Sequence, residues 1–151
     1  MRHRQAAALL ALVGLLLSAY LTLHQIGFTG QLVCGDSGSC EKVQASQWAY
    51  LAGVPVAAVG LGGYLAILAV ALWGLQHEDD PRPTRWLLAL SALGVAFTAY
   101  LSALEAFVIH AWCRWCLVSA GLITAIFLVA VTGLRKGDRA QQSSDASPQR
   151  S

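Results

Sequence analysis

Four long stretches without a charged residue constrain the fold of this 151-residue chain more than any other feature. They cover residues 6–23, 54–75, 86–104 and 115–134. Each is close to the roughly 20 apolar residues that an α-helix needs to cross the hydrocarbon core of a bilayer. The stretches are continuously apolar rather than alternating, which excludes the strands of a membrane β-barrel. The sequence therefore predicts an all-α integral membrane protein, a bundle of four transmembrane helices.

Composition supports the same class. Charged residues make up 12% of the chain, about half of the roughly 25% that soluble domains carry. Disordered chains, collagens and disulfide scaffolds are excluded, because charge, Gly plus Pro, and Cys contents are all far from those classes. A net charge of +2 is too small to favour nucleic-acid binding.

The chain divides at residue 134. We predict a four-helix membrane redox domain over residues 1–134 and a disordered cytosolic tail over residues 135–151. The tail is composed mainly of Ser, Gln, Asp and Arg and has no apolar periodicity, which is the composition of a segment that cannot bury a core.

Lys and Arg residues set the orientation. Eight of the ten lie at the amino terminus, in the turn after the second span or in the tail, and the positive-inside rule places these three segments in the cytoplasm. The prediction is a multi-pass protein of the bacterial inner membrane with both termini cytoplasmic and residues 25–53 outside. An alternative is that Met1–Ala19 is a cleaved signal peptide. Because its apolar run continues to Leu23 without a small-x-small cleavage site, a retained first helix is favoured.

All four cysteines fall on the predicted external side. Cys34 and Cys40 enclose five small, flexible or polar residues, a tether that lets two sulfurs meet at disulfide distance or separate. Cys113 and Cys116 form a C-x-x-C motif at a helix start, where the helix dipole and the neighbouring Arg114 favour a thiolate. A C-x-x-C with a second pair able to reach it predicts a dithiol relay.

Two other interpretations of the cysteines compete with the relay. They could form structural disulfides, although a C-x-x-C bridge closes too small a loop to stabilise much. They could bind zinc, but the usual signature is two C-x-x-C knuckles, and the external side is oxidising. The sequence has no haem, flavin or Fe–S motif. A lipid-soluble quinone needs none, and Cys116, one turn into the helix, is the better-placed donor to it.

Taken together, these residues resemble the vitamin K epoxide reductase family in its bacterial form, over about Leu9 to Leu134. The residues that carry the resemblance are Cys34, Cys40, the stretch Cys40-Glu-Lys-Val-Gln-Ala-Ser46-Gln-Trp48, Gly53-Val-Pro55, Gly60, Tyr64 and Cys113-Arg-Trp-Cys116. A Ser six residues after the second loop cysteine, combined with a C-x-x-C at the start of the last helix, makes the resemblance specific.

The resemblance implies a four-helix bundle around a quinone, with the external loop as its cap. Cys34 would exchange electrons with a partner protein, and Cys40 would pass them to Cys113. The Cys113–Cys116 pair would then reduce the quinone, menaquinone or ubiquinone, with Cys116 next to the ring and no metal involved. Ser46 would donate a hydrogen bond to a quinone oxygen, although a turn or capping role is its alternative. Because the chain ends in a short polar tail, the implied partner is a separate thioredoxin-fold oxidase outside the cytoplasm.

Two features leave the exact activity open. Vertebrate members have an Asn early in span two and a Tyr soon after the C-x-x-C, and both are missing here, which favours plain quinone reduction over epoxide reduction. Glu105 and His110 lie just before the C-x-x-C. Either could deliver a proton or tune the thiols, or both could simply be solvated at the external interface. The predicted function is a thiol oxidase that supports disulfide-bond formation. The alternatives are an epoxide reductase or a non-catalytic membrane protein with structural disulfides.

Overall fold

The computed structural model describes residues 2–30, 38–77 and 79–145. Its four long helices are α1 (Arg2–Gln25), α3 (Val56–Gln76), α4 (Arg82–Leu104) and α5 (Arg114–Asp145). The shorter elements are α2 (Ser39–Gln44), the 3₁₀ turn η1 (Gln47–Ala49), the strands β1 (Tyr50–Leu51) and β2 (Val54–Pro55), and the π-helical segment η2 (Glu105–Ile109). Four helices are long and apolar enough to cross a bilayer, with η2 extending the third span. The predicted all-α membrane bundle is confirmed.

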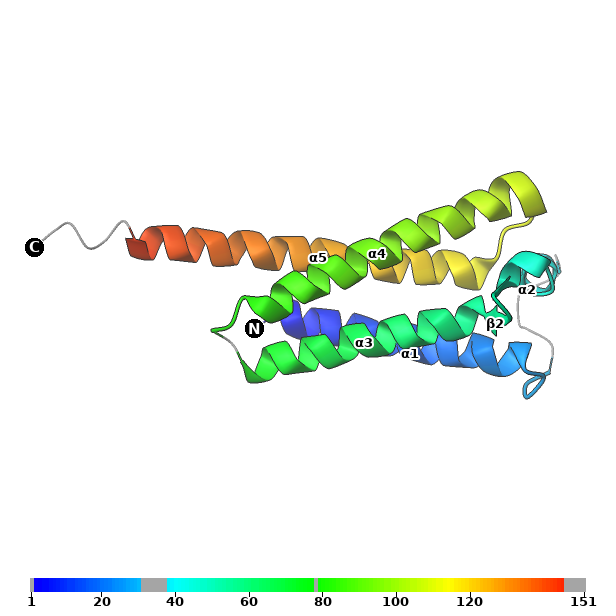
Figure 1. Ribbon diagram of the computed structural model, residues 1–151, viewed down its shortest axis with the longest axis horizontal. Coiled ribbons are helices and arrows are strands. Elements are labelled where there is room, and N and C mark those ends of the chain that lie inside the picture. Colours follow the sequence, from blue (N-terminus) through cyan, green and yellow to red (C-terminus); the bar gives the residue numbers. More distant parts are fainter. Residues whose placement is uncertain (1, 31–37, 78, 146–151) are drawn as a thin grey trace, which may run out of the picture.

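The long helices form a ring in which each packs against two others, in the order α1, α3, α4, α5 and back to α1. Figure 1 shows the start of α1 and the α3–α4 turn at one end of the bundle, and α2 and β2 at the other. α4 diverges from α3 with distance from the turn that joins them. A cavity lined by all four long helices and by α2 lies inside the ring.

Small residues bring α1 and α3 close together. The buried residues of α1 recur at alternating spacings of three and four, namely Arg4, Ala7, Ala11, Gly14, Ser18 and Leu21. Those of α3 follow the same rule, at Tyr64, Ile67, Ala71 and Gly74. This spacing keeps one narrow face of each helix against its partner, and small side chains there permit close backbone approach in lipid. The Tyr64 ring lies directly over Gly14.

Replacing Gly14 by alanine is expected to destabilise the bundle by about 2 kcal/mol, the usual cost of overpacking a tight core. A Cβ at Gly14 would lie 2.2 Å from Cε1 of Tyr64, so the ring would have to move. Gly62→Ala is the matched control, because a Cβ there meets nothing within 4 Å. Thermal unfolding in detergent measures both variants, and equal melting temperatures would contradict the packing described here.

Residues 38–55, which precede α3, fold into a cap over one end of the bundle. Within it, β1 and β2 pair antiparallel, with Tyr50 opposite Pro55 and Leu51 opposite Val54. Ala52 and Gly53 connect them, both with positive φ (52° and 83°), which is the conformation of the tight two-residue hairpin turn. The hairpin leads directly into α3, so η1 and α2 are held against the helix ends.

α5 extends past residue 134, where the membrane domain is predicted to end. The helix continues without a break to Asp145, so residues 135–145 are helical rather than disordered, and residues 146–151 lie outside the described range. Elongating a helix that is already formed needs no new nucleation, and Arg, Lys, Ala and Gln are good helix formers. Figure 1 shows this part of α5 extending beyond the other helices.

Tryptophans mark the two ends of the bundle. Trp48, Trp73, Trp86 and Trp112 are exposed on its surface, as expected for aromatic residues at the two membrane–water interfaces. Trp115 differs from them, because it is partly buried and packs edge-on against Tyr20, with ring centroids 6.0 Å apart. Trp115 therefore helps to hold α5 against α1 beside the C-x-x-C.

Candidate functional site

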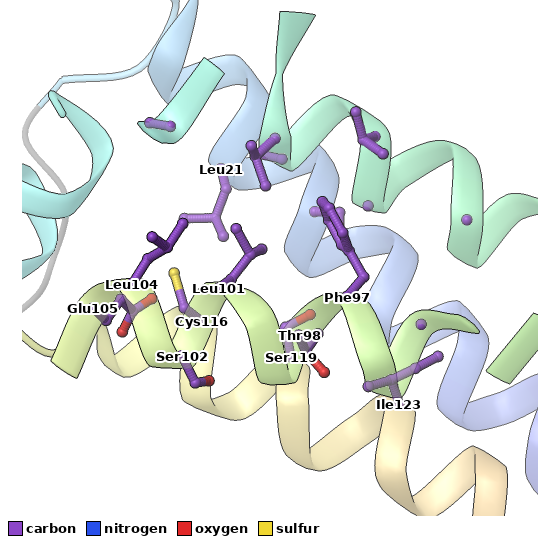
Figure 2. A pocket seen from close by; sticks show the side chains of 18 of the residues that line it. Leu21, Phe97, Thr98, Leu101, Ser102, Leu104, Glu105, Cys116, Ser119 and Ile123 are labelled. Atoms are coloured by element: carbon purple, nitrogen blue, oxygen red, sulfur yellow. The ribbon is translucent and has the colours of Figure 1, made fainter. Parts of the chain in front are cut away.

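A cavity of about 370 Å³ lies within the ring of helices beneath the cap. Every long helix contributes to its wall, and the polar or ionisable groups are few: Ser18, Gln44, Ser46, Tyr64, Thr98, Ser102, Glu105, Cys116 and Ser119. Figure 2 shows the Cys116 sulfur at one end of this cavity, with Glu105 beside it and Phe97 and Ile123 farther along. A mostly apolar pocket with a few converging polar groups suits a small, largely hydrophobic ligand.

The C-x-x-C presents its two sulfurs differently. Cys116 lines the cavity, whereas Cys113 does not and is fully buried behind it. Both thiols are free. α5 begins immediately after Cys113, and the backbone N–H of Cys116 donates to the Cys113 sulfur at 3.3 Å. Hydrogen bonding from the Cys116 thiol, aided by this N–H, lowers the pKa of Cys113 despite its burial. A thiol with a lowered pKa at a helix start is suited to thiol–disulfide exchange.

Cys40 shares one buried cluster with Cys113. Cys40 is 1% exposed and Cys113 is 0% exposed, and both belong to the apolar cluster completed by Leu21, Val43 and Ala111. Cys40 is disulfide-bonded, and its partner is neither Cys113 nor Cys116, which are free. Cys34, the other half of the predicted loop pair, lies outside the described residues. The fold thus brings two cysteines from the cap and from the start of α5 into the same dry environment.

Gln44 is a site residue that the sequence did not single out. Its amide Nε2 lies 4.0 Å from the Cys113 sulfur and 3.9 Å from the Cys116 sulfur. The sequence contained part of the information needed to predict this position. Gln44 follows Cys40 by four residues, and two residues four apart share one face of a helix. That this face would meet the C-x-x-C depended on how α2 docks.

Glu105 is not a solvated interfacial acid, as one interpretation of the sequence held. Its side chain is 3% exposed and lines the cavity. Its Oε2 accepts a hydrogen bond from the backbone N–H of Cys113 at 3.1 Å. His110, in contrast, is exposed and has the positive φ (53°) that ends η2. The solvated interpretation therefore holds for His110 and is wrong for Glu105.

Ser46 lies at the cavity wall and also has a turn role. Its hydroxyl donates to the carbonyl of Val43 at 2.7 Å, and the residue precedes η1. The hydroxyl oxygen is still an acceptor, and rotation about its bond could redirect the proton. Both of the interpretations considered for Ser46 are therefore compatible with its position.

Tyr64 connects α3 to α5 across the ring. Its hydroxyl lies 2.9 Å from the Ser119 carbonyl oxygen, to which it donates, and 3.0 Å from the Ser119 hydroxyl. Ser119 is one turn beyond Cys116, so this bond fixes the part of α5 that carries the cavity-facing sulfur. Within the described ranges, no group of three or more His, Cys, Asp or Glu side chains is arranged to hold a metal ion.

A comparison with protein-family models finds a match to the vitamin K epoxide reductase family over residues 5–131. This match covers most of the chain, reaches into all four long helices and includes every cysteine. The chain belongs to the vitamin K epoxide reductase family. Members of this family are membrane oxidoreductases that link disulfide chemistry to a quinone. Membership therefore makes the protein a membrane oxidoreductase. The predicted family and membrane class are confirmed.

Proposed function

We propose that the protein is a thiol oxidase of the bacterial inner membrane. It takes two electrons from a reduced dithiol outside the cytoplasm and passes them to a membrane quinone, thereby supporting disulfide-bond formation. The observation that carries this proposal is the arrangement of the cysteines. Cys116 faces an apolar cavity, and Cys113 behind it shares a buried cluster with Cys40.

The chemistry proceeds in two exchanges and one redox step. The partner's dithiol reduces the Cys34–Cys40 disulfide, and the partner leaves with a disulfide of its own. Cys40 then exchanges with the oxidised Cys113–Cys116 pair through a Cys40–Cys113 mixed disulfide. That exchange leaves Cys113 and Cys116 as thiols, the state in which the structure holds them. Finally, the two S–H bonds break, the Cys113–Cys116 bond forms, and two electrons and two protons convert the quinone to hydroquinone.

The residues of the cavity fit a quinone. The wall is apolar except for a few hydroxyl, amide, thiol and carboxyl groups, and quinone rings need apolar walls with hydrogen-bond donors at the oxygens. Ser46 is proposed to supply one such donor. The proposed quinone is menaquinone or ubiquinone, and the residues of the cavity wall suit either one.

The proposed partner is a separate thioredoxin-fold protein, and the proposed orientation places the cap outside and both termini in the cytoplasm. The basic residues carry the orientation, since Arg2, Arg82 and Arg85 gather at the end of the bundle opposite the cysteines. Reporter fusions at residue 151 and within the cap test this orientation. A carboxyl-terminal reporter that is active only outside the cytoplasm would contradict it.

Quinone reduction by the purified protein, supplied with a reduced thioredoxin-fold donor, tests the function. We expect turnover with the donor and none without it. Cys→Ser variants at all four positions separate the alternatives. If the substitutions abolish turnover and leave the melting temperature unchanged, the relay is supported. If the unsubstituted protein reduces no quinone and the substitutions lower its melting temperature, the cysteines have a structural role instead. Vitamin K epoxide supplied in place of quinone tests the epoxide activity.

Replacing Ser46 by alanine is expected to slow quinone reduction about tenfold, the usual effect of losing one hydrogen bond to developing charge in a dry site. Ser46→Thr keeps the hydroxyl and is expected to stay within about twofold of the unsubstituted protein. Steady-state turnover against quinone concentration measures both variants. If the two variants lose turnover equally, Ser46 serves the turn and not the quinone.

A further inference from the structure

We propose that Glu105 is the proton-transfer residue of the dithiol-to-quinone step: its carboxylate accepts the proton of the Cys116 thiol and delivers it to a quinone oxygen. This inference rests on the proposed function and names a residue to which the relay alone assigns no role. The three observations that support it are the burial of Glu105, its hydrogen bond with Cys113, and its position beside Cys116 in the cavity wall.

The carboxyl group of Glu105 lies beside both halves of the C-x-x-C. The backbone N–H of Cys113 donates to Oε2 at 3.1 Å, and Glu105 and Cys116 line the same cavity. Figure 2 shows the Glu105 carboxyl group and the Cys116 sulfur at the same end of the cavity. A buried carboxyl group that is anchored by one half of the C-x-x-C and lies beside the thiol of the other half is placed as an acceptor for that thiol's proton.

The backbone around Glu105 is built to hold this geometry. α4 widens into the π-helical segment η2 at Glu105, and the Glu105 carbonyl accepts the N–H groups of His110 and of Ala111, the latter at 3.2 Å. The positive φ of His110 then turns the chain back, so Cys113 lies over the Glu105 side chain. Single π-turns are frequent at functional sites. Here η2 begins the short segment that joins Glu105 to Cys113, eight positions later in the chain.

Gln44 complements the acid from the opposite direction. Its amide Nε2 approaches both sulfurs, at 3.9 and 4.0 Å, and an amide N–H stabilises a thiolate but cannot take its proton. The C-x-x-C therefore lies between a donor from the cap and an acceptor from η2. The titratable groups that interact with Glu105 in the described structure are Cys113 and Cys116 themselves.

Protons and electrons balance in this step. The Cys116 S–H bond breaks and its proton passes to the Glu105 carboxylate. The Cys113 S–H bond also breaks, and the disulfide forms between the two sulfurs, which releases two electrons to the quinone. Glu105 returns its proton to one quinone oxygen, and the Cys113 proton neutralises the other. Glu105 ends as the carboxylate in which it began, so it acts as a catalyst and is not consumed.

The test compares Glu105→Gln with Glu41→Gln, a control on the exposed surface of α2. Glutamine keeps the size of the side chain and an oxygen that can accept the Cys113 N–H, but it cannot carry the proton. Two half-reactions are measured by rapid mixing: reduction of the oxidised enzyme by the donor dithiol, and oxidation of the pre-reduced enzyme by quinone. For Glu105→Gln we expect oxidation by quinone to slow about 100-fold, the lower range for lost general acid–base catalysis, with reduction by the dithiol unchanged. Glu41→Gln is expected to match the unsubstituted protein in both.

Each outcome decides a different statement. Oxidation by quinone at the unsubstituted rate in Glu105→Gln overturns this inference and leaves the proposed function standing. An unsubstituted enzyme that the dithiol reduces but quinone cannot oxidise overturns both. If Glu105→Gln does not fold, Glu105→Asp is used instead, since it keeps a carboxyl group one methylene farther away. We then expect slowed oxidation with a solvent deuterium isotope effect larger than that of the unsubstituted protein, and an unchanged rate and isotope effect would overturn the inference.

Discussion

Replacing Cys116 by serine abolishes quinone reduction and causes a Cys40–Cys113 mixed disulfide to accumulate. This result is expected because Cys116 lines the cavity, whereas Cys113 shares its buried cluster with Cys40. Without the Cys116 thiol, Cys113 cannot form its own disulfide, and its thiolate instead attacks Cys40 in the Cys34–Cys40 disulfide and releases Cys34 as a thiol. No Cys116 sulfur is then present to displace Cys40 from Cys113. The loss of turnover should exceed about 10⁴-fold, because one of the two redox sulfurs is missing. Non-reducing mass mapping of the protein as purified identifies the linkage.

Cys113→Ser is the matched control for this experiment. It should lose turnover to the same extent, because it removes the other half of the C-x-x-C, but it cannot form the Cys40–Cys113 bond. Neither substitution breaks a disulfide of the structure, since both thiols are free, and melting temperatures should change little. A Cys40–Cys116 disulfide that accumulates in Cys113→Ser, with no Cys40–Cys113 disulfide in Cys116→Ser, would reverse the proposed order of the relay.

The second large effect is expected at the opposite end of the bundle, from Arg4→Met. The guanidinium group of Arg4 donates to the Gly74 carbonyl oxygen, to those of His77 and Asp80 at 2.9 and 2.8 Å, and to the Thr84 hydroxyl at 3.2 Å. These acceptors lie at the end of α3, in the turn and in the first turn of α4. Arg4 thus supplies donors to carbonyls at the end of α3 and in the turn that follows it.

Methionine preserves the apolar stem of Arg4 but removes every donor. Each buried carbonyl left without a partner costs about 1–3 kcal/mol, and water can reach the acceptors nearest the surface. We therefore expect a loss of about 3 kcal/mol in unfolding free energy, measured by denaturant titration in detergent. Arg2→Met, at an exposed position of the same helix, is the control and should change stability little. Equal stabilities of the two variants would show that the Arg4 network contributes nothing.

The difference between Arg4 and Arg2 illustrates what charge patterning can predict. Both residues counted equally in the positive-inside argument, because that rule depends only on the number of basic residues near a span. In the structure one is buried among backbone carbonyls and the other is exposed. Arg4 faces the bundle because it continues the three- and four-residue spacing of the buried face of α1. The α3–α4 turn lies at the same end and supplies the carbonyls that Arg4 binds.

The sequence by itself determined the membrane class, the four spans and the cysteines that can carry redox chemistry. Each of these depends on short-range properties: apolar length must match bilayer thickness, and thiol reactivity belongs to the residue type and its immediate neighbours. The family match agrees with the motif, which combines the loop cysteines, Ser46 and the C-x-x-C.

Only the tertiary structure decided the environment of those cysteines. From the sequence, Glu105 could be interpreted as a solvated acid near a helix end, whereas in the structure η2 turns the chain back over its side chain. The role of Gln44 depends on the docking of α2 against the C-x-x-C. The extension of α5 to Asp145 was also not predicted from the composition of the tail, because an existing helix can continue through a polar sequence at little free-energy cost. The burial and hydrogen bonding of a side chain depend on residues that are distant in the chain. The residue pattern of a single helix gives no information about those distant residues.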